Sequence, residues 1–273
     1  MLKKVGFHGP RHGQPLPMML LRNDIAPPRP EIMSNGAWAL FLDLDGTLLD
    51  IAASPESVFV PKNLIETLAK LRMQLDGAVA VLSGRGLRTI DRLLHPLLVC
   101  AGAEHGAVLR FPDGTIMEAA METVVPTCWR QQLHRQAEEW PGVLIEEKTH
   151  GVAVHYRANP QLGLPVIGLL EKFVESNSAF EILPALMARE LRHRTINKGE
   201  ALRRLMQTEI FDGRKPLFIG DDVTDEDAIA AAHALGGLGF RVQEAFAGEP
   251  ARVRAWLAEI AAHVNAPVDT AER

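Results

Sequence analysis

Cysteine is nearly absent from this sequence of 273 residues, which holds only Cys100 and Cys128. Neither cysteine belongs to a spacing typical of a metal site, and one pair makes no disulfide framework. Reduced thiols are typical of intracellular proteins. We therefore expect both cysteines to be free, buried thiols in a cytoplasmic protein.

A surplus of basic residues is missing as well. The formal net charge is −5 and the isoelectric point is near 6.1, so no excess of cations is available to neutralise a nucleic-acid backbone. A general nucleic-acid binder is therefore excluded. An anionic substrate would have to be held by locally placed cations or by a metal ion.

The beginning of the chain has no sustained apolar run. Lys3 and Lys4 are not followed by one, and the stretch Met18–Leu21 is too short to span a bilayer. Prolines also recur before residue 31. We expect residues 1–35 to be a poorly ordered leader rather than a signal peptide, and we predict no membrane partner.

From residue 37 onward, short apolar runs alternate with helical patterns. Strands alternating with helices of this length predict an α/β fold, a parallel sheet with helices on both faces. The predicted strands are Ala37–Leu44, Ala78–Leu82, Leu97–Cys100 and Leu217–Ile219, and the predicted helices are Pro61–Met73, Leu87–Leu94, Lys198–Met206 and Pro250–His263.

The middle of the chain has a different pattern, in which strands with alternating polar residues lie between two helices. This pattern predicts an α+β cap domain at residues 110–192, inserted into a core made of residues 36–109 and 193–268. Its predicted helices are Pro126–Trp140 and Gly163–Glu175, and its predicted strands are Val143–Glu147, Val152–Arg157, Ala179–Ile182 and Met187–Arg192.

Two carboxylates follow the first apolar strand, in the stretch Phe41–Leu49. Asp43 and Asp45 are separated by one residue and precede a Gly-Thr pair, which places them at the carboxyl edge of the sheet, where ligands bind in open α/β folds. Two like charges this close need a cation, and Mg²⁺ prefers carboxylate and carbonyl oxygens. The motif therefore indicates a magnesium site.

A second acidic cluster, Gly220–Asp227, follows the strand Leu217–Ile219. Its later acids are explained by the next helix, because Thr224 or Asp225 is a suitable cap and acids favour a first helical turn. Helix capping does not explain Asp221 and Asp222, which we interpret as completing the magnesium site.

Two further elements suit a phosphate group. Ser83, Gly84 and Arg85 follow the strand Ala78–Leu82, so the hydroxyl and amide groups open toward the same edge of the sheet. Lys198 lies at a predicted helix start and can neutralise a phosphoryl group. Each signal is weak alone.

Taken in order, Asp-x-Asp-Gly-Thr, Ser-Gly-Arg, Lys and Gly-Asp-Asp resemble the haloacid dehalogenase superfamily of phosphatases. The resemblance covers about Trp38–Arg241 and implies a Rossmann-like core with an inserted cap. It implies that Asp43 is the nucleophile that forms an aspartyl phosphate, and that Asp45 is the general acid and base.

The same resemblance implies the remaining core ligands. Mg²⁺ would be bound by the Asp43 carboxylate, the Asp45 carbonyl and Asp221, with Asp222 beside it. The phosphoryl group would be held by cations and fixed dipoles, as its spread of charge requires. These groups come from Ser83, Gly84, Arg85, Lys198 and the backbone of Asp43, Leu44, Asp45, Gly46 and Thr47.

The inserted segment resembles the trehalose-6-phosphate phosphatase family. Its Glu-x-Lys at Glu146 and Lys148, its His-Tyr-Arg ending at Arg157, and Glu190 match family signatures, as does the long run after Gly220. The resemblance implies that Glu146, Lys148 and Glu190 bind sugar hydroxyls of trehalose 6-phosphate, in the last step of trehalose biosynthesis, and that Arg157 either binds the substrate or only braces the cap. The segment Ala103–Gly106 also resembles a family segment; His105 and His155 are interpreted as structural hydrogen-bonding groups.

The sequence departs from the family at His193 and Thr195, where a proline and a glycine are usual. Other readings stay open at this point: a phosphatase of sucrose phosphate or a mannosyl-phosphoglycerate, a phosphosugar mutase, or a non-catalytic regulatory module. The last predicts lost core carboxylates, yet Asp43, Asp45 and Asp221 are present. We expect a monomer that acts on a small sugar phosphate.

Overall fold

The computed structural model describes residues 27, 37–52 and 57–263, so the predicted leader lies almost wholly outside the described residues. A sheet of seven strands in the order β11-β10-β1-β2-β3-β4-β5 forms the centre of the larger unit. Its strands are β1 (Trp38–Leu42), β2 (Val79–Leu82), β3 (Cys100–Ala103), β4 (Val108–Arg110), β5 (Ile116–Glu118), β10 (Lys215–Gly220) and β11 (Leu238–Arg241).

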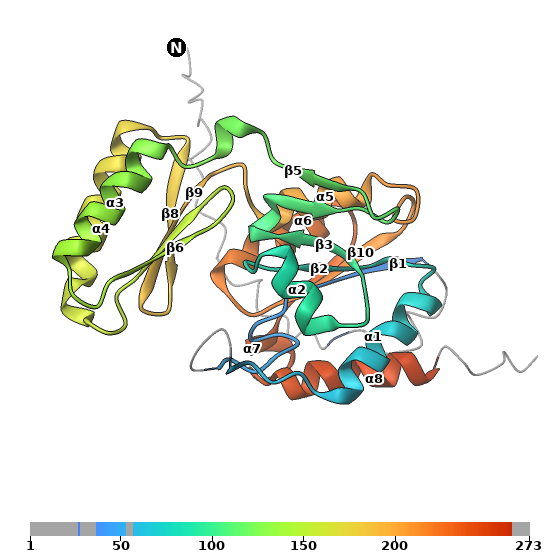
Figure 1. Ribbon diagram of the computed structural model, residues 1–273. Coiled ribbons are helices and arrows are strands. Elements are labelled where there is room, and N and C mark those ends of the chain that lie inside the picture. The colour runs from blue at the N-terminus through green and yellow to red at the C-terminus, as the bar shows by residue number, and fades with distance from the viewer. Residues whose placement is uncertain (1–26, 28–36, 53–56, 264–273) are drawn as a thin grey trace, which may run out of the picture.

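Five neighbouring strands of this sheet, from β11 to β3, are parallel, and β4 and β5 continue it as an antiparallel hairpin. All residues of β1 are buried, as expected for a central strand covered on both faces. Helices α1 and α8 lie together on one face and α5 and α6 on the other (Figure 1). The helices of this unit are α1 (Lys62–Gln74), α2 (Leu87–Leu94), η3 (Glu104–Gly106), α5 (Lys198–Met206), η6 (Val223–Asp225), α6 (Glu226–Ala234), α7 (Val242–Ala245) and α8 (Pro250–His263).

The smaller unit, which we call the inserted unit, is an antiparallel sheet of four strands in the order β6-β7-β9-β8, covered by two helices (Figure 1). It has its own hydrophobic core, separate from the core of the larger unit. Its elements are η4 (Met121–Thr123), α3 (Thr127–Glu139), β6 (Leu144–Glu147), β7 (Val152–His155), η5 (Pro160–Leu162), α4 (Gly163–Ser176), β8 (Phe180–Ala185) and β9 (Ala188–His193).

The two faces of the four-stranded sheet differ in polarity. Val152, Val154 and Leu191 belong to the inserted unit's hydrophobic core with residues of α3 and α4. Glu146 and Glu190 both pair with Ala153, so alternation along the strands places them on the opposite face. The polar face of the inserted unit is therefore the one not covered by its helices.

The α/β class and the predicted elements are confirmed, with three differences. The strand predicted at Leu97–Cys100 is displaced: in the structure, residues 97–99 are a loop and strand β3 begins at Cys100. The hairpin β4–β5 and strand β11 were not predicted, and β5 joins the larger sheet although residues 110–118 had been assigned to the insert. Cys128 is exposed rather than buried, whereas Cys100 is buried; both are free thiols.

No helix among the described residues is both long and apolar enough to cross a membrane.

Candidate active site

The predicted catalytic residues meet at the carboxyl edge of the seven-stranded sheet. Asp43 follows β1, Ser83 follows β2 and Asp221 follows β10, while Lys198 is the first residue of α5. Parallel strands bring these loop residues to one edge. They line a cavity of about 250 Å³ formed by Asp43, Asp45, Ile51, Ser83, Gly84, His105, Lys198, Asp221, Asp222 and Thr224.

A buried lysine connects two acids at the floor of this cavity. Lys198 Nζ donates to Asp43 Oδ1 at 2.6 Å and to Asp225 Oδ1 at 2.6 Å. Burial raises the pKa of Asp43 well above its usual range, although Lys198 opposes this shift. Burial lowers the pKa of Lys198, but the two acids outweigh it and keep the pKa above its ordinary value. The lysine is therefore a fixed cation beside the predicted nucleophile.

Asp221 lies directly against the backbone of Gly46. A Cβ at Gly46 would approach Asp221 Oδ2 to 2.0 Å, so only glycine fits there, and its φ of +77° is also one that glycine adopts readily. Burial, Asp225 and Asp222 raise the pKa of Asp221 to about 6. Oxygen atoms of Asp43, Asp221 and Asp225 lie within 4.8 Å of one another, which is a donor set suited to a hard divalent cation.

Asp225 is a site residue that the sequence analysis assigned to helix capping. It is fully buried, and its Oδ2 accepts hydrogen bonds from the backbone N–H groups of Asp221 and Asp222, each at 3.0 Å. The N-cap of η6 is Asp222, whose Oδ1 accepts from Val223 N at 2.6 Å, and Asp225 completes a capping box with it. Asp222 lines the cavity but does not belong to the group of three close carboxylates. The glycine at position 220 is the sequence feature that goes with this contact, because a Cβ there would meet the Asp225 carboxylate at 2.3 Å.

Asp45 forms a bidentate ion pair with Arg85. Arg85 Nε donates to Asp45 Oδ2 at 2.6 Å, and Nη2 donates to Oδ1 at 2.7 Å. The hydrogen bond to Asp45 raises the pKa of Arg85 despite partial burial. Arg85 therefore contacts the predicted general acid, a role the sequence did not indicate.

The remaining predicted phosphate-binding groups lie close to these side chains. Ser83 is buried, and its Oγ accepts from Arg85 N at 3.2 Å. The carbonyl of Leu44 accepts from the N–H groups of the turn after it, and Thr47 Oγ1 is buried without a hydrogen-bond partner among the described residues.

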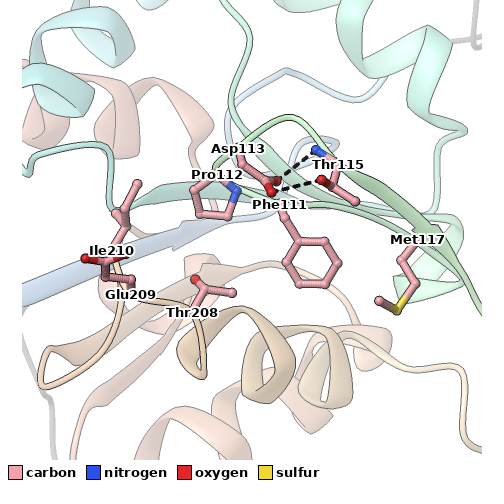
Figure 2. A pocket seen from close by; sticks show the side chains of 8 residues that line it. All are labelled: Phe111, Pro112, Asp113, Thr115, Met117, Thr208, Glu209 and Ile210. Atoms are coloured by element: carbon pink, nitrogen blue, oxygen red, sulfur yellow. Dashed lines mark hydrogen bonds between the residues drawn. The ribbon is translucent and has the colours of Figure 1, made fainter.

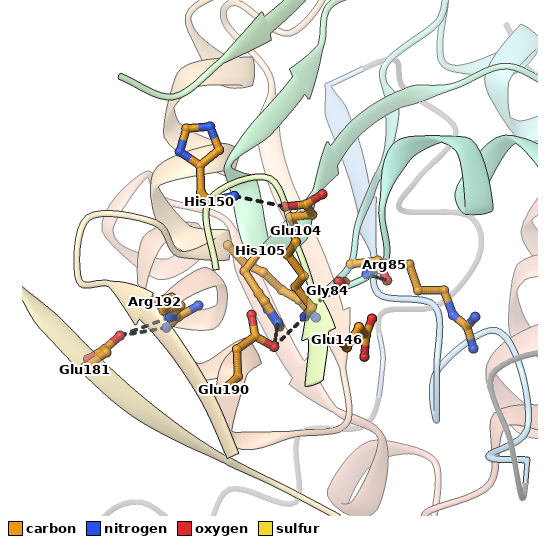
Figure 3. Close-up of polar contacts among 12 residues, drawn as sticks. Gly84, Arg85, Glu104, His105, Glu146, His150, Glu181, Glu190 and Arg192 are labelled. Carbon is orange, nitrogen blue, oxygen red and sulfur yellow. Dashed lines mark hydrogen bonds and ion pairs between the residues drawn. The ribbon is translucent and has the colours of Figure 1, made fainter. Parts of the chain in front are cut away.

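The inserted unit contributes Lys148 and Glu190 to the rim of this site. Lys148 Nζ donates to Glu190 Oε2 at 2.5 Å and to the carbonyl of Gly84 at 3.3 Å. His105 Nε2 lies 3.5 Å from the same Glu190 oxygen. Burial opposes ionisation of Glu190, but Lys148 and His105 outweigh it and hold the pKa well below its usual range. Figure 3 shows His105 of the larger unit and Glu190 of the inserted unit pointing toward each other.

The other two predicted sugar-binding residues differ in placement. Glu146 points toward Arg85 of the larger unit (Figure 3), and its Oε2 is 2.7 Å from His155 Nε2. The hydrogen bond from His155 lowers the pKa of Glu146. Arg157 lies beyond the far end of β7, where its Nη2 contacts the carbonyl of Leu186 at 3.5 Å. The structure does not bring Arg157 to the other predicted residues.

A larger cavity, of about 520 Å³, lies at the β4–β5 turn and the loop after α5 (Figure 2). The residues that line it include two acids, Asp113 and Glu209, but no lysine or arginine. Asp113 accepts hydrogen bonds from Thr115. The smaller cavity holds the acids and the buried lysine, so the chemistry belongs there.

Comparisons with known proteins identify the family of this chain. The family model described as trehalose-phosphatase matches residues 41–248. A probable trehalose-phosphate phosphatase of Sinorhizobium fredii is 40% identical over 206 residues, 75% of this chain and 77% of that protein. The trehalose-6-phosphate phosphatase of Escherichia coli is 33% identical over 213 residues, 78% of this chain and 79% of that protein.

Solved structures show the same fold. The C-terminal domain of Candida albicans trehalose-6-phosphate phosphatase has a TM-score of 0.70 at 20% identity and covers 87% of this chain and 98% of that chain. A sucrose-phosphatase from Synechocystis has a TM-score of 0.51 at 17% identity and covers 77% and 84%. At such identities the likeness is one of fold, here of the haloacid dehalogenase type. With the family match over most of the described residues, it follows that this chain is a phosphatase of the trehalose-phosphatase family.

Proposed function

We propose that this enzyme hydrolyses trehalose 6-phosphate to trehalose and inorganic phosphate, with Mg²⁺ and through an aspartyl-phosphate intermediate. The observation that supports it is the position of the Lys148–Glu190 pair, which contacts the loop of Gly84 beside the cavity of Asp43 and Lys198. The proposed sugar-binding pair thus contacts Gly84, a residue that lines the cavity of the phosphoryl-transfer groups. In the cell, the reaction would complete trehalose biosynthesis in the cytoplasm.

In the first step, an Asp43 oxygen attacks phosphorus, and the bond between phosphorus and the sugar C6 oxygen breaks. Asp45, which in this step carries a proton and is no longer ion-paired with Arg85, gives that proton to the leaving oxygen, so trehalose departs as a neutral alcohol. In the second step, Asp45 takes a proton from water, which attacks the phosphorus of the aspartyl phosphate and releases phosphate. Lys198, fixed by Asp43 and Asp225, neutralises charge on the phosphoryl oxygens throughout.

The acidic residues fit a magnesium ion. Asp43 and Asp221 have raised pKa values because they are buried beside other acids, and a cation would stabilise their ionised forms. We propose that Asp43, Asp221 and the carbonyl of Asp45 hold Mg²⁺, with Asp222 nearby and Asp225 fixing Lys198 and the loop after β10. When bound, the ion supplies charge neutralisation at the phosphoryl group.

The inserted unit would act as a cap that recognises the disaccharide. Lys148, Glu190 and Glu146 present charged donors and acceptors on its polar face, and sugar hydroxyls pair with such groups. A site that hydrogen-bonds specific hydroxyls discriminates strongly against substrates without them.

The test is phosphate release from a panel of sugar phosphates with Mg²⁺: trehalose 6-phosphate, sucrose 6-phosphate, glucose 6-phosphate and mannosyl-3-phosphoglycerate. We expect a strong preference for trehalose 6-phosphate. Another preferred sugar phosphate would leave the core mechanism standing and overturn our assignment of Glu146, Lys148 and Glu190. Inactivity of folded, metal-loaded protein on every substrate would overturn the proposal.

A single variant distinguishes the proposed sugar-binding role of the inserted unit from the chemistry of the larger unit. Glu190→Gln keeps the size of the side chain but removes the charge that pairs with Lys148. We expect kcat/KM for trehalose 6-phosphate to fall roughly 10- to 100-fold, as for loss of a hydrogen bond to a charged group. Hydrolysis of p-nitrophenyl phosphate, which has no sugar, is the matched control and should change little.

A further inference from the structure

Two consecutive residues at the end of β3 adopt a backbone conformation that is unusual for them. Glu104 has a φ of +48° and His105 a φ of +60°, and neither is a glycine. Residues in this region carry conformational strain and persist where the surroundings fix them, often at functional sites. Both side chains reach toward the inserted unit (Figure 3).

The Glu104 carboxylate binds the turn of residues 148–151 between β6 and β7. Its Oε2 accepts from Thr149 N at 2.7 Å and from His150 N at 3.4 Å, and its Oε1 accepts from Thr149 Oγ1 at 2.9 Å. One carboxylate of the larger unit therefore satisfies three donors of the inserted unit. Hydrogen bonds to an ionised acceptor are stronger than neutral ones.

Contacts within the inserted unit also stabilise this turn. Arg130 of α3 donates to the carbonyls of Lys148 and Thr149 at 3.1 Å and 3.5 Å. The carbonyl of His150 accepts from Val125 N at 2.9 Å, and the imidazole ring of His150 contacts Thr123 Oγ1. The shape of the turn thus has support that is independent of Glu104, which supplies its attachment to the larger unit.

The attachment lies next to the sugar-binding pair. Lys148 begins the turn, and Lys148 and His105 both contact Glu190. The His105 ring packs on Gly84, where a Cβ would meet its Nε2 at 2.6 Å. Of the two strained residues, Glu104 therefore contacts the turn that begins with Lys148, and His105 contacts Glu190.

We propose that Glu104 is a specificity-determining residue that acts by positioning: it holds the turn 148–151 so that Lys148 and Glu190 lie over the phosphoryl site. Glu104 does not touch the reacting atoms. Its role, which rests on the proposed function, is to make efficient turnover depend on a substrate large enough to reach the inserted unit.

The first experiment compares two substrates in the Glu104→Gln variant. The amide keeps the size of the side chain but loses the charge and one acceptor. We expect kcat/KM for trehalose 6-phosphate to fall roughly tenfold, mainly through KM, and that for p-nitrophenyl phosphate to stay within about twofold. Glu138→Gln, at an exposed position on α3, is the matched control. Equal losses on both substrates, or no loss on either, would overturn the proposal.

A second variant tests whether the turn is the route of the effect. Thr149→Val removes the hydroxyl that bonds Glu104 Oε1 and keeps the shape of the side chain. If Glu104 acts through the turn, the double variant should lose less selectivity than the product of the two single losses. Strictly multiplicative losses would contradict the assignment.

A third readout does not depend on any sugar. Amide hydrogen exchange at Thr149 should accelerate in Glu104→Gln, because this N–H loses its ionised acceptor, while the amide of Leu42 in β1 should not change. Wild-type protein inactive on trehalose 6-phosphate would refute the proposed function alone. Unchanged exchange at Thr149 would refute the positioning role of Glu104 alone.

Discussion

The ion pair Lys198–Asp225 of the larger unit and the pair Glu146–His155 of the inserted unit differ in exposure. In the larger unit, Lys198 and Asp225 are 2% and 0% exposed and contact each other. On the polar face of the inserted unit, the paired side chains of Glu146 and His155 are 52% and 36% exposed. Buried charges are tolerated only with fixed partners, whereas exposed pairs can exchange partners with solvent or ligand.

This difference matches the two tasks that we propose. Charge on a transferring phosphoryl group is met best by dipoles and cations that are already in place before the reaction. A sugar arrives hydrated and exchanges water for protein hydrogen bonds, so partly exposed acids suit it. The Lys148–Glu190 pair, with both side chains 11% exposed, lies between these extremes and between the two units.

The largest effect should follow from a change in the core. Asp43→Asn removes the nucleophile, and we expect every phosphate ester, with or without a sugar, to lose at least about 10³-fold in kcat. Parallel assays of trehalose 6-phosphate and p-nitrophenyl phosphate, with thermal melting to show folding, measure this. A loss confined to the sugar substrate would mean that Asp43 is not the nucleophile.

The next effect concerns stability. Asp225→Asn removes one of the two acids that fix Lys198 and turns an amide toward two backbone donors, so we expect about 3 kcal/mol less free energy of unfolding. The matched change in the inserted unit, Glu146→Gln, should cost less than about 1 kcal/mol, because its pair with His155 is exposed. Urea unfolding of both variants makes the comparison; equal losses would contradict it.

Asp225 also shows where the sequence was insufficient. An acid just before a helix is a common cap, so capping explained it without a site. Its side chain accepts hydrogen bonds from the N–H groups of Asp221 and Asp222. It also accepts one from Lys198, which lies 27 residues earlier in the sequence. A contact of this kind depends on the packing of α5 against α6 and η6, which no local pattern encodes.

The parallel strands β1, β2 and β10 and the acids after β1 and β10 were predictable because apolar runs and motif spacing are local properties, whereas β11, which is also parallel, was not predicted. Strands β4 and β5 were not predicted, since they are only three residues each and β5 is exposed. The contacts of Glu104 and His105 with the inserted unit also could not be foreseen. They depend on the left-handed conformation of two residues that do not favour it.

The dependence of stability on pH should have opposite signs in the two units. In metal-free protein the pKa of Asp221 is about 6 against an ordinary 3.8, so the folded form binds its proton more tightly. The free energy of unfolding should therefore decrease as pH rises from about 4 to 6. The pKa of Glu190 is lowered, so its contribution is present above its ordinary 4.5 and is lost as pH falls below it.

Urea unfolding from pH 3.5 to 7 measures both contributions. Asp221→Asn should reduce the decrease between pH 4 and 6, to which Asp43 with its raised pKa also contributes, and Mg²⁺ should reduce it further in the wild type. Glu190→Gln should reduce the loss below pH 4.5. If Asp221→Asn leaves the slope unchanged, Asp221 does not titrate as its surroundings imply.

The smallest effect compares one asparagine from each unit. Asn197 Oδ1 accepts from Glu200 N at 2.8 Å and caps the helix that begins with Lys198, while Asn177 Oδ1 accepts from Ala179 N at 3.1 Å after α4. Asn197→Ala should lower the free energy of unfolding by about 1 kcal/mol. Because the cap sets the first turn of α5, kcat should also fall several-fold on every substrate. Asn177→Ala should leave kcat unchanged, since its turn contacts neither the phosphoryl site nor the polar face; a fall there would mean that the inserted unit is coupled to chemistry through its fold and not only through its side chains.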